Sequence, residues 1–393
     1  MKVDLIGTGM SGATLTQEAA SAVARADVLI GAPRMLLPYR DSGKVLFESY
    51  TPSGTAAFLG RCGGTHACVL LSGDTGFYSA AQTLLPALRG AHTVRLLCGI
   101  SSLQYACARM ELPWERMHCV SLHGREGSIA VHVRSHRYCF FLLDHRYTAA
   151  AVCERLCAFG LSDVTVRVGQ CLGGPEESVL TGTAQELCAL PDAPLAVLVT
   201  ENEDFCPYTP CGIPDDAFVR SRIPMTKREI RALAVAGLCI TPEDRCWDIG
   251  CGTGSVSVEM ALHCPFGAVY AFDREPEAVR LTQENARQFG ADNLHVYEGT
   301  APACLPEDLP APDKVFIGGS AGRLPDILGE VRRRSPHALV TVSAISLETL
   351  AQAQALLPEA RVTQLCAARG SRVGTHTLMR ALNPVYLVTG RAT

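Results

Sequence analysis

Asp248-Ile249-Gly250-Cys251-Gly252-Thr253-Gly254 lies directly after a hydrophobic run and directly before a helical pattern. Three glycines at alternate positions allow a sharp backbone turn and leave no side chain between the backbone and a ligand. A second acid, Asp273, ends the next apolar run. Doubly wound folds place a carboxylate there to accept hydrogen bonds from ribose hydroxyls. The sequence therefore predicts a strand, a loop and a helix that hold a nucleoside-containing cofactor.

The spacing of the glycines indicates which cofactor this is. A nicotinamide or flavin fingerprint requires Gly-x-Gly-x-x-Gly. Here the third glycine, Gly254, comes one residue early, and Ser255 stands where that fingerprint needs Gly or Ala. Alternate glycines after an acid are typical of S-adenosylmethionine (SAM) sites, so we expect SAM rather than a dinucleotide. A turn without a ligand is disfavoured, because closely spaced glycines weaken the start of a helix.

Length and charge exclude several classes of protein. The chain has 393 residues, 48% of them hydrophobic and 19% charged, so two or three domains can each bury a core. Its net charge of −4 argues against a general nucleic-acid binder, which is normally basic. No apolar stretch is long enough to span a bilayer, and no charged-then-apolar leader opens the sequence. We expect a cytoplasmic protein with no nucleic-acid or membrane partner.

The 18 cysteines are an unusually high count, but no Cys-x-x-Cys pair occurs. The closest pairs have no histidines at zinc spacing. Most of the cysteines lie in apolar runs, where cysteine acts as a small hydrophobic residue. We expect neither a disulfide framework nor a protein-bound metal.

Residues 1–200 alternate short β-rich runs with helical patterns. The predicted strands are 2–6, 28–30, 67–71, 93–97, 138–143, 164–168 and 196–199, and the predicted helices are 12–25, 76–88, 101–109 and 148–159. Residues 201–214 follow as an acidic, proline-rich stretch without periodicity, which indicates a linker.

The second half continues the alternation of strands and helices. Thr226-Lys227-Arg228-Glu229 has the form of a capping box ahead of an apolar helical run, and Gly290 sits where a helix C-terminal glycine belongs. The predicted strands are 245–249, 268–272, 294–297, 314–317, 338–342 and a final pair near 361–367 and 384–389, and the predicted helices are 255–262, 275–289 and 346–357. This pattern predicts an α/β protein with mostly parallel sheets covered on both faces.

Four segments of the first half are predicted loops at the ends of strands. They are Gly7-Thr8-Gly9-Met10-Ser11-Gly12, Ser72-Gly73-Asp74-Thr75-Gly76-Phe77-Tyr78, Gly99-Ile100-Ser101-Ser102-Leu103-Gln104-Tyr105 and Ser121-Leu122-His123-Gly124-Arg125. Helix N-termini at the carboxyl ends of strands mark a binding crevice.

Together these segments resemble the tetrapyrrole methylase family, in its precorrin carbon-5 methyltransferase branch. The second half, from Gly212-Ile213-Pro214-Asp215 through the Asp248–Gly254 loop to 299–302 and 316–320, resembles the decarboxylating precorrin carbon-15 methyltransferases. Their order and fusion are similar to the two-domain precorrin-6Y or cobalt-precorrin C5,15-methyltransferases of cobalamin biosynthesis. The sequence departs from the family pattern at Met10 and Thr75, where proline is common, but neither change removes a glycine.

The resemblance implies a tetrapyrrole-methylase fold of two α/β subdomains over residues 1–203. A linker over 204–215 and a Rossmann-like class I SAM-dependent methyltransferase fold over 216–393 would follow. It also implies one SAM site in each domain. The implied activity is methylation of carbons 5 and 15 of a precorrin macrocycle, with loss of the ring C acetate carboxyl group.

The same resemblance implies the residues that contact SAM. In the second domain they are Thr226, Gly250, Cys251, Gly252, Thr253, Gly254, Asp273 at the ribose and Ala301 beside the adenine. In the first domain they are Gly7, Gly9, Asp74, Phe77, Ser101 and Ser102. Thr226 is also explained as a plain helix cap, and Phe77 as core packing.

Methyl transfer to a nucleophilic ring carbon needs little acid–base help, so no Ser-His-Asp arrangement is expected and catalytic residues stay unassigned. A polycarboxylate substrate does need cations, and arginine suits carboxylates. The candidates are Arg220, Arg222, Lys227, Arg231, Arg369 and Arg372, with His123 and Arg125 at the first domain's cleft. Each of these is also explained as a solvated surface charge.

Three other functions stay open. The first is an RNA or protein methyltransferase, and the acidic net charge argues against the RNA enzyme. A nicotinamide-dependent oxidoreductase is opposed by Ser255, and the third alternative is a SAM sensor without catalysis. Relatives of both halves form oligomers, so the resemblance implies a homo-oligomer. Whether the substrate carries cobalt stays undecided.

Overall fold

The computed structural model describes residues 1–49, 51–124, 127–207 and 211–393. The chain divides into two compact units. Unit 1 comprises Met1–Arg125, Tyr138–Val152 and Thr165–Glu201, and unit 2 comprises Glu126–Arg137, Cys153–Val164 and Asn202–Thr393. Asp292 explains why two short early segments belong to unit 2. Its carboxylate accepts hydrogen bonds from the backbone N–H groups of Ile129 and Val131, at 2.7 and 3.2 Å.

The first sheet of unit 1 is entirely parallel, in the order β3-β2-β4-β1-β5. Its strands are β1 (Lys2–Gly7), β2 (Val28–Gly31), β3 (Val45–Glu48), β4 (His66–Leu71) and β5 (Thr93–Leu97), and its helices are α1 (Gln17–Arg25), α2 (Pro33–Leu36), α3 (Pro52–Leu59) and α4 (Ala81–Arg89). Val3 and Leu5 of β1 pack on one side and Ile6 on the other, in separate apolar clusters. This two-sided burial is what a parallel sheet requires.

The second sheet of unit 1 is mixed, in the order β6-β7-β10-β8-β9. The pair β6–β7 is parallel, and the other neighbouring pairs are antiparallel. The strands are β6 (His118–Ser121), β7 (Tyr138–Leu142), β8 (Thr165–Gln170), β9 (Ser178–Thr183) and β10 (Val197–Glu201). The neighbouring helices in the chain are α5 (Ser102–Arg109), α6 (Ala130–Ser135), α7 (Ala149–Ala158) and α8 (Ala184–Leu187).

Unit 2 contains a seven-stranded sheet in the order β13-β12-β11-β14-β15-β19-β16. The strands are β11 (Arg245–Ile249), β12 (Ala268–Asp273), β13 (Leu294–Glu298), β14 (Lys314–Ile317), β15 (Leu339–Ala344), β16 (Arg361–Leu365) and β19 (Val385–Arg391). The strand β19 runs antiparallel to the other six. The chain moves outward from β11 to β13 and then returns to β14, so a topological switch point lies between β11 and β14, where such folds bind ligands.

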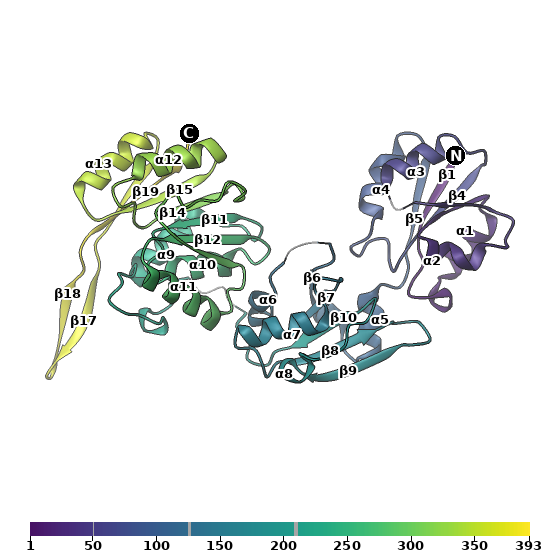
Figure 1. Cartoon of the computed structure of the whole chain (residues 1–393), viewed down its shortest axis with the longest axis horizontal. Helices are drawn as coiled ribbons and strands as arrows, with labels where there is room; N and C mark the ends of the chain where they lie inside the picture. Colours follow the sequence, from purple (N-terminus) through teal and green to yellow (C-terminus); the bar gives the residue numbers. More distant parts are fainter. Residues whose placement is uncertain (50, 125–126, 208–210) are drawn as a thin grey trace. The chain divides into compact units, whose positions relative to one another are not determined.

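Helices cover both faces of this sheet (Figure 1). One face carries α9 (Arg228–Leu238), α10 (Ser255–His263) and α11 (Pro276–Phe289), and the other carries α12 (Leu324–Arg334) and α13 (Leu347–Leu356). Trp247, which is completely buried, lies in the apolar core between the sheet and α12. The α/β class predicted from the sequence is confirmed.

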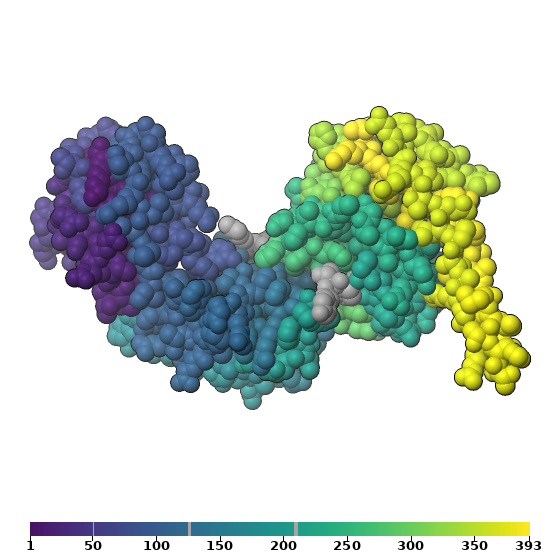
Figure 2. All heavy atoms as spheres, turned by 180° about the vertical axis from the view of Figure 1, so that it is seen from behind, coloured from purple at the N-terminus to yellow at the C-terminus, as the bar shows by residue number. Residues whose placement is uncertain are grey.

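A two-stranded hairpin arm, β17 (Ala368–Val373) and β18 (His376–Ala381), extends from unit 2. Figure 2 shows it in yellow, standing away from the rest of this unit. Most of its residues are exposed, including Leu378 and Met379.

Most predicted elements are confirmed within a few residues, and Gly290 ends α11 in the left-handed conformation as expected. The strands that were not predicted are β3, β6 and β9 at sheet edges, and the hairpin arm. Edge strands are only partly buried, so they lack the apolar pattern on which strand prediction depends.

The predicted capping box at Thr226 is wrong. Helix α9 begins at Arg228, and its N-cap residue is Lys227, which makes no capping hydrogen bond through its side chain. Glu229, expected to close the box, instead accepts two hydrogen bonds from Arg369 of the hairpin arm, at 3.0 and 2.6 Å. Glu229 thus forms a long-range ion pair with Arg369 instead of the expected local cap. None of the helices in the described part of the chain combines the length and apolar character needed to cross a lipid bilayer.

Candidate functional site

A cleft of about 720 Å³ opens in unit 2 at the carboxyl ends of the sheet strands. Its volume falls in the range of about 300–1,000 Å³ that small-molecule sites occupy. The lining comes from the segments 223–227, 249–252, 272–275, 299–301 and 318–321, together with residues before and after the hairpin arm. The cleft therefore lies at the switch point between β11 and β14.

The glycine loop closes tightly on both sides of the cleft. Gly250 has a φ of +73°, and a Cβ atom there would lie 2.6 Å from the carbonyl oxygen of Gly319. Gly252 has a φ of +59°, and a Cβ atom there would lie 2.7 Å from the carbonyl oxygen of Pro224. Only glycine fits either position, because a side chain would meet both backbone strain and fixed backbone atoms.

Asp273 lines the cleft beside this loop. Its Oδ2 accepts a hydrogen bond from the Gly252 backbone N–H at 2.8 Å, and its Oδ1 accepts one from the Glu275 N–H at 3.1 Å. The carboxylate is thus held at the end of β12, where the sequence pattern placed a ribose acceptor.

Asp248 is buried beneath the loop and does not line the cleft. Its Oδ2 accepts a hydrogen bond from Ser257, and its Oδ1 has no partner among the described residues. Burial, with a smaller contribution from the nearby negative charge of Asp273, raises the pKa of Asp248 to about 7 against the opposing effect of the Ser257 hydrogen bond.

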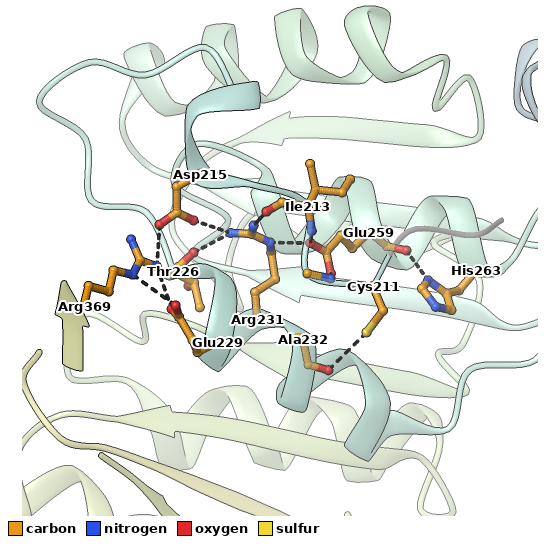
Figure 3. A network of polar contacts seen from close by, with 11 residues as sticks. Cys211, Ile213, Asp215, Thr226, Glu229, Arg231, Ala232, Glu259, His263 and Arg369 are labelled. Atoms are coloured by element: carbon orange, nitrogen blue, oxygen red, sulfur yellow. Dashed lines mark hydrogen bonds and ion pairs between the residues drawn. The ribbon is translucent and has the colours of Figure 1, made fainter. Parts of the chain in front are cut away.

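Arg231 is completely buried in a polar network (Figure 3). Its guanidinium donates to Glu259 at 2.5 Å, to the Thr226 carbonyl at 2.6 Å and to the Ile213 carbonyl. It also forms an ion pair with Asp215 at 3.4 Å. These partners leave Arg231 unavailable to a substrate, and the structure places it as a support for the wall of the cleft.

The structure brings together seven of the other residues expected in the second domain's site. The residues that line the cleft are Thr226, Lys227, Gly250, Cys251, Gly252, Asp273 and Ala301. Thr253 and Gly254, at the end of the glycine loop, are not among the residues that line the cleft. The Thr253 carbonyl accepts from Asn285 at 2.8 Å, and Gly254 is the N-cap residue of α10. Arg372 lies on the exposed hairpin arm, outside the cleft lining.

In unit 1, the expected cofactor residues meet where β1, β4 and β5 end. A Cβ atom at Gly7 would lie 2.7 Å from both Gly73 and Gly99, and Gly9 pairs with Gly73 as an isolated bridge. Asp74 accepts from the Gly76 N–H at 2.8 Å and from the Gly99 N–H at 2.9 Å. These contacts join the three loops.

The remaining residues expected in unit 1 have local roles. Ser101 caps α5 through a capping box with Gln104, and Ser102 is the first residue of that helix. Phe77 packs against the apolar cluster that contains Phe140. His123 is exposed, and its Nδ1 lies 3.3 Å from the Leu143 carbonyl. Arg125 lies outside the described residues.

Several cleft residues were not identified from the sequence. They are Ile223, Pro224, Arg274, Gly319, Ser343, Ile345, Leu382, Asn383 and Val385. Among these residues, Gly319 could have been suspected from the sequence, because it belongs to the glycine pair Gly318-Gly319 directly after β14. Ile223 and Pro224 reach the cleft from the segment ahead of α9, and Arg274 from the end of β12. The rest come from the end of β15 and from the segment after the hairpin arm, which residue spacing does not reveal.

Comparison with known proteins matches two families. Residues 2–188 match the tetrapyrrole (corrin/porphyrin) methylases, and residues 216–390 match the precorrin methyltransferase domain. A probable cobalt-precorrin-6B C(15)-methyltransferase (decarboxylating) from Pyrobaculum calidifontis is 43% identical over 193 residues, which is 47% of this chain and 98% of that protein.

Two further relatives carry related names. A precorrin-6Y C(5,15)-methyltransferase [decarboxylating] from Sinorhizobium sp is 32% identical over 260 residues, 65% of this chain and 62% of that protein. A crystal structure of a precorrin-6y C5,15-methyltransferase from Geobacter metallireducens GS-15 is 34% identical, with a TM-score of 0.43, and covers 45% of this chain and 96% of that one.

The family matches thus define a methyltransferase of a class that uses SAM. The chain belongs to the precorrin methyltransferase family, with a tetrapyrrole methylase region ahead of the precorrin methyltransferase domain. The resemblance inferred from the sequence is confirmed.

We predict that Arg231→Met lowers the free energy of unfolding of unit 2 by about 3–5 kcal/mol, because it leaves the Glu259 carboxylate buried without its cation. Urea unfolding followed by the fluorescence of the buried Trp247 measures the loss. The double variant Arg231→Met/Glu259→Gln removes the orphaned charge and should recover part of the stability. An unchanged unfolding midpoint in the single variant would contradict the role of Arg231.

We also predict a pH dependence from Asp248. The folded state keeps a proton on this carboxyl up to about pH 7, whereas the unfolded chain loses it near pH 4. The free energy of unfolding therefore falls as pH rises through this window, by an amount on the order of 4 kcal/mol.

Urea unfolding of ligand-free protein between pH 4 and pH 8 tests this, with Asp248→Asn as the reference because it cannot titrate. The wild-type protein should lose stability relative to the variant as pH rises. Parallel curves for the two proteins would mean that Asp248 is ionised throughout.

Proposed function

We propose that this chain methylates carbons 5 and 15 of a precorrin macrocycle and removes the ring C acetate carboxyl group, in cobalamin biosynthesis. The observation that carries the proposal is the cleft in which the glycine loop and Asp273 meet. It lies in the part of the chain that covers 98% of the carbon-15 methyltransferase relative. Family membership supports the substrate class.

The residues of the cleft fit SAM as proposed from the sequence. The glycine loop leaves bare backbone toward the ligand, Asp273 presents a carboxylate for ribose hydroxyls, and Ala301 offers an apolar surface for the adenine. When bound, SAM supplies an electrophilic methyl group. The protein orients the two reactants and excludes water, and such positioning can contribute about 7–11 kcal/mol to lowering the barrier.

A second SAM site in unit 1 belongs to the same proposal. The loops after β1, β4 and β5 converge through Gly7, Gly73 and Gly99, and Asp74 bonds to two of their backbone N–H groups. Close backbone packing of this kind fits a loop cluster that accepts a nucleoside. We therefore propose one SAM site per domain and no resident metal.

We keep the proposed domain bounds of 1–203 and 216–393 with a linker over 204–215, of which residues 208–210 lie outside the described structure.

The hairpin arm supports the proposed homo-oligomer, because the side chains of Val373, Leu378 and Met379 are 46%, 52% and 68% exposed. Exposed apolar side chains on a projecting arm are typical of association surfaces. We also propose a cytoplasmic location.

Mass spectrometry tests the activity directly. The purified chain is incubated with SAM and either metal-free or cobalt-containing precorrin-6B. We expect the product to gain two methyl groups and to lose one CO₂. A chain that binds SAM but modifies neither form of the macrocycle contradicts the proposal and favours a SAM sensor. The two substrates also show whether cobalt is required.

Asp273→Ala should weaken SAM binding to the second domain by about 10- to 100-fold, because the ribose loses a charged acceptor and the Gly252 N–H loses its partner. Methylation at carbon 15 should fall with it, while methylation at carbon 5 continues. Asp74→Ala is the matched variant in the first domain and should show the opposite pattern. If Asp273→Ala retains full carbon-15 methylation, the ribose assignment is wrong.

A further inference from the structure

A second hollow, of about 490 Å³, lies beside the SAM cleft of unit 2. It is lined by Phe218, Arg220, Ser221, Ile223, Pro224, Met225 and Lys227. The cleft and the hollow share Ile223–Met225 and Lys227. The segment ahead of α9 therefore forms a common wall, and Lys227 borders both spaces.

Arg220 and Lys227 give this hollow a positive charge that the protein does not neutralise. Neither side chain forms an ion pair with any of the described residues, and both are exposed. Nearby carboxylates are already paired. Glu277, which bonds to Ser221 of the lining and lies near Arg222, pairs with Arg280 at 3.0 Å, and Asp215 and Glu229 pair with Arg369.

Acidic groups also occur near Arg220, in a neighbouring hollow that it shares with Asp215 and Asp216. Asp215 is already paired with Arg231 and Arg369, at 3.4 and 2.9 Å. Two cations thus border a space that shares a wall with the cleft, and none of the residues described as lining that space is an Asp or Glu.

We propose that this hollow binds a peripheral carboxylate arm of the macrocycle, and that Arg220 and Lys227 are positioning residues that hold it. The inference rests on the proposed function, since a precorrin is a polycarboxylate. Phe218, Ile223 and Met225 supply apolar walls for the methylene groups of such an arm, and the cations bind its head. Because the wall is shared, an anchored arm places the ring over the SAM cleft.

The anchored carboxylate is one that the substrate retains. A carboxylate that leaves as CO₂ passes its negative charge to the ring, and a cation bound to it in the ground state would oppose that change. Interactions help a reaction only if they are stronger in the transition state than before it. The hollow therefore fixes the orientation of the ring and takes no part in the loss of CO₂.

Steady-state kinetics with precorrin-6B and SAM test this. Arg220→Gln and Lys227→Gln should each raise KM for the macrocycle by about tenfold, the effect of losing one charge-assisted hydrogen bond. Calorimetry should find the Kd for SAM unchanged within about twofold in both variants. The number of CO₂ molecules released per methyl group gained at carbon 15 should also stay as in the wild-type protein.

Two further variants serve as controls. Lys227→Arg keeps the charge and should keep KM near the wild-type value. Arg228→Gln removes the adjacent charge, which lies beside Glu229 and borders the neighbouring hollow, and should leave KM unchanged.

The outcomes separate the inference from the proposed function. A wild-type chain that never methylates the macrocycle defeats the proposed function, and the inference fails with it. A wild-type chain that is active, with unchanged KM in both glutamine variants, overturns the inference alone. A rise in the Kd for SAM that matches the rise in KM assigns these residues to the cofactor and also overturns it. A fall in CO₂ released per methyl group shows that the hollow holds the departing carboxylate.

Discussion

The buried guanidinium of Arg231 is the constraint on which the site in unit 2 depends. It joins the Ile213–Asp215 segment to Thr226, which lines the cleft, and to Glu259 of α10. Glu259 in turn accepts hydrogen bonds from the backbone N–H groups of Gly212 and Ile213, at 3.0 and 2.8 Å. A buried pair of this kind is costly to break, because each partner would be left charged without water. The network therefore holds the wall of the cleft against the helix that follows the glycine loop.

The same network reaches the hairpin arm. Arg369 of β17 pairs with Glu229 in the first turn of α9 and with Asp215. The arm thus contacts the helix whose N-terminus borders both the cleft and the hollow beside it. Ion pairs thus connect the hairpin arm to the network that supports the cleft. If the arm joins copies of the chain, association and the cleft share these residues.

In both units, a carboxylate fixes a glycine loop by accepting a hydrogen bond from its backbone. Asp273 accepts a hydrogen bond from the Gly252 N–H, and Asp74 accepts one from the Gly99 N–H. In each case, a carboxylate at or just beyond the end of one strand holds a glycine loop after another strand. Charge-assisted bonds to backbone N–H groups are stronger than neutral ones, so they fix loops that have no side chains of their own to pack. Asp248 differs, because burial favours its protonated form and its second oxygen has no partner among the described residues.

The sequence by itself determined the α/β class, most of the strands, and the glycine loop with Asp273, because these depend on local spacing and on apolar runs. It also carried the family resemblance. Tertiary structure alone decided that Arg231 is buried and paired rather than free for substrate, and that Glu229 binds Arg369 rather than capping α9. Both outcomes depend on residues far apart in the chain, and the local spacing of residues does not show which of them will pair. The edge strands and the hairpin arm escaped prediction for a related physical reason: they are held by hydrogen bonds to neighbouring strands and bury too little apolar surface to leave a pattern.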